Sequence, residues 1–181
     1  MLNWKPDDPE MYEDVQTRYN YAHSNLNKPA DVRLKKMWRS SRDSARTPVQ
    51  WDSSENAGFT TGKPWFYVNP NYTEINVAQQ EQDPDSLLNF YREAIRLRKS
   101  LPVVRYGRYR EFFPMDPKRY VYSREMENQK LLVICSYNDK PVKMKTPAGF
   151  DLAKAKCILG NYKDRSPLLQ AYECRVYLWN E

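Results

Sequence analysis

The chain has 181 residues, of which 40% are hydrophobic, 14% aromatic and 29% charged, and its formal net charge is +6. These proportions are typical of a globular protein with one or two domains, and they exclude a disordered chain. No apolar run approaches the roughly 18 residues that span a bilayer, and the acidic first residues are unlike a signal peptide, so we expect a cytoplasmic protein with no membrane partner.

Two helices are predicted near the start of the chain, over residues 9–21 and 29–39. Each range opens with a proline, which suits the first turn of a helix. Residues 40–82 contain several prolines and glycines, which predicts loops rather than long regular elements. The same range is rich in large aromatic side chains, which a solvated loop does not need. We therefore expect residues 40–82 to pack against a large surface.

The clearest helix is predicted over residues 83–101, where apolar residues recur every three or four positions. Asp83 is the expected cap, Pro84 the first helical residue and Pro102 the stop. After Pro102 the apolar residues form short runs or alternate, and turn residues separate the runs, which predicts antiparallel strands. The predicted strands are 105–113, 119–126, 130–137, 142–146, 154–159 and 172–179.

The three cysteines do not form a recognisable metal or redox motif. Cys135, Cys157 and Cys174 are odd in number, lack a Cys-x-x-Cys spacing and each lie in an apolar stretch. Free cysteines of this kind usually behave as small core residues. We therefore expect reduced, buried thiols in a protein from a reducing compartment.

The positive net charge arises only in the second half of the chain. Residues 1–101 hold 14 basic and 14 acidic residues, whereas residues 102–181 hold 15 basic and 9 acidic ones. The basic residues of the second half are dispersed and form no block of like charge. This pattern favours a solvated surface over a nucleic-acid site.

Histidine and glycine are too scarce for several common sites. His23 is the only histidine, so a histidine-rich zinc site is excluded, and a serine or cysteine nucleophile would have one candidate base. The five glycines form neither a G-x-G-x-x-G dinucleotide loop nor a Walker phosphate loop. We expect no metal and no cofactor.

The densest polar cluster is the run SRDSARTPVQWD at residues 41–52. A carbohydrate pocket uses such groups, because arginines and carboxylates bind pairs of hydroxyls and a flat ring packs against the apolar face of a sugar. The same composition is typical of a structural loop in which Arg and Asp bind each other and Trp51 lies in the core. From the residues alone, both interpretations stay open.

The run SRDSARTPVQWD, followed by NAGFTTGKPW and VNPNYTEINV, resembles the oligo-1,6-glucosidase branch of glycoside hydrolase family 13, the α-amylase superfamily. The resemblance extends to the final PLLQAYECRVYLW and covers nearly the whole chain. The departures are mild. Val49 stands where a methionine is usual, Ser44 where an asparagine is usual, and Leu2 where a threonine is usual.

The resemblance implies an α+β fold in two parts. Residues 1–101 would be the C-terminal remnant of a catalytic (β/α)8 barrel, contributing N-terminal helices and long loops. Residues 102–181 would form an antiparallel β-sandwich called domain C. A chain without the other barrel strands would expose apolar surface, so we expect it to self-associate through residues 1–101.

The resemblance places no catalytic residue in this chain. A retaining glycosidase needs a nucleophilic carboxylate and an acid about 5 Å apart. In this family those groups lie upstream of the position of Met1, and neither Asp52 nor Glu55 replaces them. Arg46 matches the family's pocket arginine and is the expected substrate-binding residue. With an aspartate from an early barrel loop, it would contact the terminal glucose.

The implied function is that of the C-terminal part of an intracellular α-glucosidase. It would hydrolyse non-reducing-end α-1,6 bonds of isomalto-oligosaccharides by a retaining mechanism, and this chain alone would be inactive. The expected partner of the complete enzyme is an α-glucan oligosaccharide and not a nucleic acid. One alternative is a trehalose-6-phosphate hydrolase. Another is a non-catalytic module that binds carbohydrate through exposed Trp and Tyr side chains or serves as a scaffold.

Overall fold

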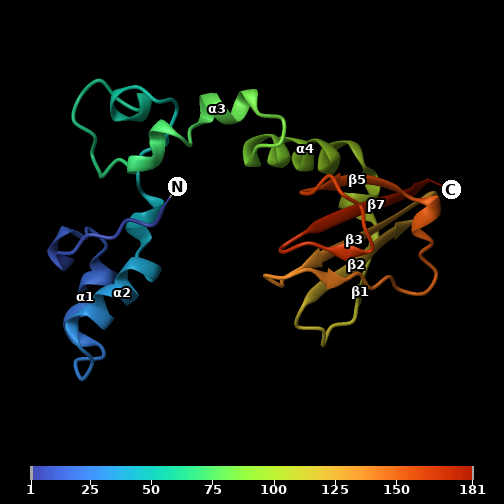
Figure 1. Cartoon of the computed structure of the whole chain (residues 1–181), viewed down its shortest axis with the longest axis horizontal. Coiled ribbons are helices and arrows are strands. Elements are labelled where there is room, and N and C mark those ends of the chain that lie inside the picture. Colours follow the sequence, from blue (N-terminus) through green and yellow to red (C-terminus); the bar gives the residue numbers. More distant parts are fainter. Residues whose placement is uncertain (1, 181) are drawn as a thin grey trace. The chain divides into compact units, whose positions relative to one another are not determined.

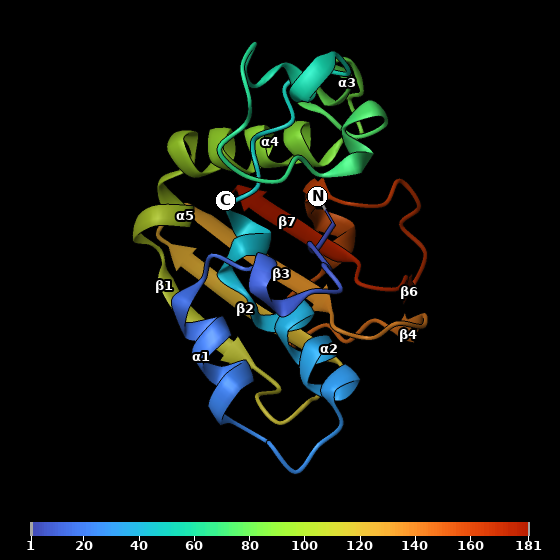
Figure 2. The same ribbon diagram turned by 90° about the vertical axis from the view of Figure 1, so that its left-hand side faces the viewer.

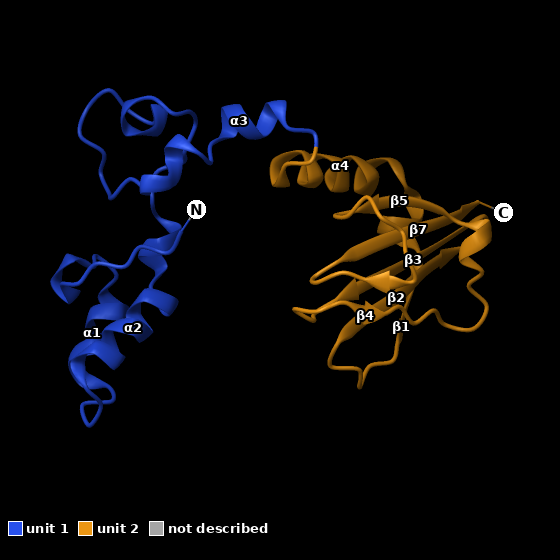
Figure 3. Cartoon of the chain, viewed as in Figure 1, with its two compact units in different colours: residues 1–84 blue, residues 85–181 orange. Residues whose placement is uncertain are grey.

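The computed structural model describes residues 2–180, and the chain forms two compact units, Met1–Pro84 and Asp85–Glu181 (Figure 3). Each unit has buried apolar clusters of its own. The units divide between residues 84 and 85, near the start of the predicted helix 83–101, whereas the predicted domains divide after that helix. The assignment of residues 1–101 to a catalytic domain and 102–181 to domain C stays a prediction.

The first unit consists of short helices joined by long loops (Figure 1). They are η1 (Pro9–Met11), α1 (Val15–His23), α2 (Ala30–Ser40), η2 (Arg42–Ala45), η3 (Glu55–Gly58), η4 (Pro70–Thr73) and α3 (Val77–Gln82). The predicted helix 29–39 is confirmed as α2, but a single helix over 9–21 is wrong. The chain straightens after η1 because the backbone N–H groups of Glu13 and Asp14 bind the carboxylate of Asp43 at 2.8 and 3.0 Å.

The core of the first unit is aromatic. Trp4, Tyr12 and Met37 are buried together, and the Trp4 ring lies 5.2 Å from the Tyr12 ring and 5.0 Å from the Phe66 ring. The loop range 40–82 therefore contributes part of the core, as its composition predicts. Other aromatic side chains of the same range stay in solvent, since Trp65 is 64% exposed.

Over residues 85–180, the second unit contains two α-helices and seven strands. They are α4 (Leu87–Ser100), α5 (Pro102–Tyr106), β1 (Arg108–Phe112), β2 (Arg119–Met126), β3 (Gln129–Ser136), β4 (Val142–Lys143), β5 (Lys156–Gly160), β6 (Leu168–Leu169) and β7 (Cys174–Asn180), with the short helix η5 (Leu152–Lys154) before β5. A strand lies in each of the six predicted ranges, although β4 has only two residues and residues 105–106 of the first range belong to α5. The short strand β6 is not among the predicted ones.

The predicted start of the long helix is wrong, whereas its predicted end before Pro102 is right to within one residue. Ser86 caps α4, because its Oγ accepts the backbone N–H of Asn89 at 3.2 Å, and Pro84 lies in the turn before that cap. At the other end α4 stops at Ser100, and Pro102 opens a separate helix, α5, where its missing N–H is harmless. With 14 residues, α4 is the longest helix, and no helix within residues 2–180 is long and apolar enough to cross a membrane.

The sheet is antiparallel, with strand order β1-β2-β3-β7-β5 (Figure 1). The short strand β4 pairs separately with β6 (Figure 2). Both faces of this sheet are covered, which explains the continuous buried run Leu131–Ile134 in β3. On one face Val103 of α5 packs against Leu131, Val133 and Leu178. On the other face, residues of β4, β6 and η5 pack against a second buried cluster, which includes Val121 and Leu132.

Candidate functional site

Residues 41–52, here called the Arg46 loop, are held by a buried carboxylate. The hydroxyl of Ser41 accepts the backbone N–H of Asp43 at 3.2 Å and so starts the turn η2. The Asp43 side chain is fully buried and binds the N–H groups that precede α1. Nη1 of Arg46 donates to Asp43 Oδ1 at 3.1 Å. Asp43 therefore joins the Arg46 loop to the start of α1.

Arg46 is both anchored and accessible. Its side chain is 40% exposed, whereas that of its partner Asp43 is 0% exposed. A guanidinium has five N–H donors in a planar fork, so one bond to Asp43 leaves donors that can reach a second acceptor. The structural interpretation of the loop is thus correct for the Arg46–Asp43 pair, and it does not conflict with a binding role for Arg46.

The end of the Arg46 loop presents Trp51 to solvent. The Trp51 side chain is 50% exposed, so the expectation that it lies in the core is wrong. The backbone of the same segment is firmly held, because the N–H of Trp51 donates to the carbonyl of Ala57 at 2.9 Å. Gln50 is buried and donates to the carbonyl of Ile75 at 2.5 Å. A rigid segment therefore carries an exposed indole.

The carboxylate of Asp52 is fixed by the turn that follows it. Asp52 Oδ1 accepts the N–H of Ser54 at 2.8 Å and its hydroxyl at 2.5 Å, and these bonds lower the pKa of Asp52. Asn56, Ala57 and Gly58 all have positive φ angles, of 55°, 60° and 64°. A Cβ on Gly58 would lie only 2.6 Å from a carboxylate oxygen of Asp52. Glycine at this position lets the turn close over Asp52.

A second buried carboxylate, that of Asp14, also has a structural role. It accepts the hydroxyl of Thr17 at 2.5 Å and the N–H of Arg42 at 3.3 Å. The bond from Thr17 is the main cause that lowers the pKa of Asp14, against the effect of burial. A general acid needs a raised carboxyl pKa at neutral pH. Asp14 and Asp52 are shifted in the opposite direction.

Tyr12 lies near the buried carboxylate of Asp43. Burial and the negative charge of Asp43 raise the pKa of Tyr12 to about 12, so its hydroxyl stays protonated at neutral pH. Within residues 2–180, no group of three His, Cys, Asp or Glu side chains is placed to hold a metal ion. The chemistry available to the Arg46 loop is therefore binding by a fixed cation and an exposed ring.

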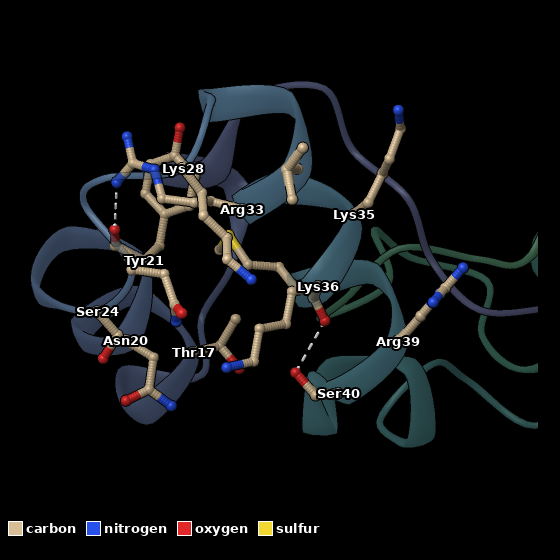
Figure 4. A pocket seen from close by; sticks show the side chains of 13 residues that line it. Thr17, Asn20, Tyr21, Ser24, Lys28, Arg33, Lys35, Lys36, Arg39 and Ser40 are labelled. Carbon is tan, nitrogen blue, oxygen red and sulfur yellow. Dashed lines mark hydrogen bonds between the residues drawn. The ribbon is translucent and has the colours of Figure 1, made fainter.

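A basic cavity lies apart from the Arg46 loop, between α1 and α2 (Figure 4). It has a volume of about 430 Å³, and its lining includes Lys28, Arg33 and Lys36 but not Arg46. Arg33 is fixed there, since its Nη1 donates to the carbonyl of Tyr21 at 2.7 Å and its guanidinium lies over the Tyr21 ring. None of these residues is predicted from the sequence to belong to a site, although the basic residues of 29–39 indicate a positively charged helix face.

A comparison with family models identifies the fold to which the Arg46 loop belongs. The model described as "Alpha amylase, catalytic domain" matches residues 9–107, which is more than half of the chain. This chain belongs to the α-amylase family. The matched range contains the whole Arg46 loop, and it ends just beyond α5, where the sheet begins.

The chain is similar to named members of that family. The oligo-1,6-glucosidase of Heyndrickxia coagulans is 42% identical over 173 residues, which cover 93% of this chain and 30% of that protein. The oligo-1,6-glucosidase of Parageobacillus thermoglucosidasius is 37% identical over 177 residues, which cover 93% and 31%. The crystal structure of Bacillus licheniformis trehalose-6-phosphate hydrolase matches with a TM-score of 0.89 at 34% identity, covering 100% of this chain and 34% of that one. The chain thus spans about a third of the length of these relatives.

Proposed function

We propose that this chain is the C-terminal part of an intracellular α-glucosidase that acts on the non-reducing ends of short α-1,6-linked glucans. The observation that carries the proposal is the Arg46 loop, in which a buried carboxylate fixes a guanidinium that stays 40% exposed. Relatives named oligo-1,6-glucosidase support the substrate class. In the complete enzyme, Arg46 would bind hydroxyls of the terminal glucose by charge-assisted hydrogen bonds.

We further propose that residues 1–101 are the end of a catalytic (β/α)8 barrel and that residues 102–181 are its domain C, a β-sandwich. The match of residues 9–107 to a catalytic-domain model supports the first part. The antiparallel five-stranded sheet, with β4 and β6 paired over one of its faces, supports the second. The α+β class itself follows directly from the helices and the antiparallel sheet.

The aspartates in and beside the Arg46 loop do not suit glycoside hydrolysis. A retaining mechanism needs a nucleophile and an acid on either side of the scissile bond. Asp14, Asp43 and Asp52 each accept two or more hydrogen bonds from neighbouring groups of the chain. We therefore propose that both catalytic carboxylates belong to another part of the complete enzyme, and that residues 1–181 contribute binding through Arg46.

Activity measurements test this division of labour. The chain of residues 1–181 is expected to release no p-nitrophenol from p-nitrophenyl-α-glucoside and no glucose from isomaltose at high protein concentration. A complete enzyme of the same family, assayed in parallel, is the positive control. A clear rate that Asp52→Ala abolishes would show that the chain has its own catalytic site and would overturn the proposal.

A second candidate is the hydrolysis of trehalose-6-phosphate, which the similarity to the Bacillus licheniformis structure favours. The complete enzyme would then cleave trehalose-6-phosphate faster than isomaltose. A third candidate, a carbohydrate-binding module, is favoured by the exposed side chains of Trp51 and Trp65. In that case the isolated chain would bind isomaltose or soluble glucan with a millimolar or lower Kd. Calorimetric titration measures this directly.

A further inference from the structure

Two of the three cysteines face each other at one end of the pairing between β3 and β7. Cys135 of β3 lies directly opposite Cys174 of β7, and their Sγ atoms are 3.1 Å apart. Both thiols are free, and both residues are half-buried rather than fully buried as expected. In the neighbouring pair, the N–H of Ser136 donates to the carbonyl of Glu173 at 2.7 Å. The cysteines therefore occupy a non-hydrogen-bonded position, where opposed side chains lie closest.

We propose that Cys135 and Cys174 form a redox-active dithiol, which low-molecular-weight disulfides convert reversibly into a cross-strand disulfide. At a non-hydrogen-bonded position the two Cα atoms lie about 4.5 Å apart, which is within the range that disulfides span. The cysteines are the last register pair of β3 and β7, and the pairs from Gln129–Asn180 up to them run without a shift. Closing the bond therefore needs rotation of two side chains and no change of strand pairing.

The two thiols differ in a way that sets the order of the steps. The hydrogen bond between their sulfur atoms lowers the pKa of Cys135 and raises that of Cys174, and burial adds to the increase at Cys174. A thiolate, and not a thiol, attacks a disulfide. Cys135 is therefore the first nucleophile, and Cys174 resolves the mixed disulfide.

The reaction balances with oxidised glutathione as the oxidant. The Cys135 thiolate attacks one sulfur of glutathione disulfide, forms a mixed disulfide and releases one glutathione thiolate. Cys174 then gives its proton to that thiolate or to water, and its own thiolate attacks Cys135 Sγ. The second glutathione leaves as a thiolate. The two cysteines are oxidised, and one glutathione disulfide is reduced to two thiols.

The third cysteine serves as an internal control. Cys157 lies in β5 opposite Tyr177, and both pack against the apolar cluster on the other face of the sheet. Cys135 and Cys174 pack with the cluster that contains Val103. Cys157 is as free as the other two and is also half-buried. It differs from the other two in facing Tyr177 instead of a second cysteine and in lying on the opposite face of the sheet.

Peptide mapping of the full chain tests the proposal without any substitution. Cleavage by trypsin after Lys130, Lys156 and Arg165 puts each cysteine on its own peptide. After reduction, dialysis and incubation with oxidised glutathione, we expect a non-reducing map to show the Cys135 and Cys174 peptides linked. Thiol titration of the oxidised chain should find one free thiol, whereas the reduced chain has three. Treatment with dithiothreitol should restore the other two. Oxidation should also raise the thermal midpoint of the sheet by several degrees, since the bond closes a loop between β3 and β7.

Three variants sharpen the test. Cys157→Ser should form the linked peptide as fast as the unchanged chain. Cys135→Ser should lose it, and Cys174→Ser should stop at a stable mixed disulfide between Cys135 and glutathione. The proposal is wrong if excess oxidised glutathione yields no linked peptide from the unchanged chain. It is equally wrong if the main product contains Cys157 or joins two chains.

Discussion

Asp43 shows how one side chain determines the structure of the candidate site. Its carboxylate is fully buried, yet it binds two backbone N–H groups before α1 and the guanidinium of Arg46. Burying a charge without such partners would cost several kcal/mol or more. Asp43 therefore holds the Arg46 loop in place, and Arg46 is its only charged partner among the contacts that the described residues make to this carboxylate.

Arg46→Ala in the complete enzyme is expected to lower kcat/KM by an amount equivalent to about 2–4 kcal/mol, because it removes a charge-assisted contact and leaves Asp43 buried without its cation. Steady-state kinetics on isomaltose, with chemical denaturation as a check of stability, measure the effect. Arg42→Ala is the matched control, since Arg42 is an exposed arginine of the same turn. Unchanged kinetics would contradict a binding role for Arg46, and a loss of stability alone would leave it the structural role of pairing with Asp43.

Gly58→Ala is expected to lower the free energy of unfolding of the first unit by about 1–3 kcal/mol, because alanine disfavours a positive φ and its Cβ would meet the Asp52 carboxylate. Chemical denaturation followed by Trp fluorescence measures the loss. Gly149→Ala is a useful comparison, since Gly149 has a φ of 87° but open space around its Cα. If Gly58→Ala lowers the free energy of unfolding no more than Gly149→Ala does, contact of the new Cβ with Asp52 is unimportant.

At the scale of elements, α4 presents an apolar stripe to solvent. Leu87, Tyr91 and Ile95 are spaced by four residues, and their side chains are 67%, 60% and 51% exposed. Residues at this spacing lie on one side of a helix. Contiguous apolar surface of this kind is rare on soluble monomers and marks contact sites. We propose that a second copy of the chain covers this stripe, in line with the expected self-association.

Replacing Tyr91 and Ile95 together by Lys is expected to shift the isolated chain from dimer towards monomer at micromolar concentration, because two charges would have to be buried in the contact. Sedimentation velocity measures the mass directly. Met115→Lys is the control, since Met115 is 91% exposed but lies in the loop between β1 and β2. A compact monomer of the unchanged chain would contradict the proposal.

The turn between β1 and β2 depends on the ionised form of Asp116. Burial opposes ionisation, but the N–H of Lys118 and the side chains of Lys145 and Arg119 outweigh it and lower the pKa of Asp116 to about 2. The same carboxyl has a pKa of about 3.9 in an unfolded chain. A lowered folded-state pKa stabilises the protein above pH 4, and this contribution is lost as the pH falls towards 2.

Asp116→Asn is therefore expected to lower stability at pH 7 and to flatten the fall in stability between about pH 4 and 2. Denaturation curves at several pH values measure both effects. The control is Asp139→Asn, which changes an exposed aspartate of the same unit. An unchanged acid profile in Asp116→Asn would mean that other carboxyl groups account for acid unfolding.

Elements with a strong local pattern are predictable from the sequence, and those set by distant contacts are not. The strand 119–126 and the two-residue turn at 127–128 follow from alternation and turn residues, and the structure confirms both. The break between η1 and α1 is not predictable, because Asp43 causes it from 29 and 30 residues away. In the candidate site, Arg46 is predicted only through the resemblance to a known family. Its pairing with the buried Asp43 is not predictable and is seen only in the structure.

At the scale of the whole molecule, each unit has its own core, but the core of the first unit is smaller than that of the second. The first unit buries one small aromatic cluster, whereas the sheet of the second unit has a buried cluster on each face. Loops that carry binding groups are commonly supported by a more regular neighbouring structure. The proposed arrangement of a barrel end followed by domain C would place Arg46 on the part of this chain with the smaller core.

The position of β7 also bears on how the sheet assembles during folding. β1, β2 and β3 are joined by short turns, so their pairing closes small loops and can form early. β7 lies between β3 and β5, and its pairing with β3 joins residues as far apart as Gln129 and Asn180. Closing such a distant contact costs more chain entropy. Insertion of β7 is therefore expected to limit the refolding rate of the second unit.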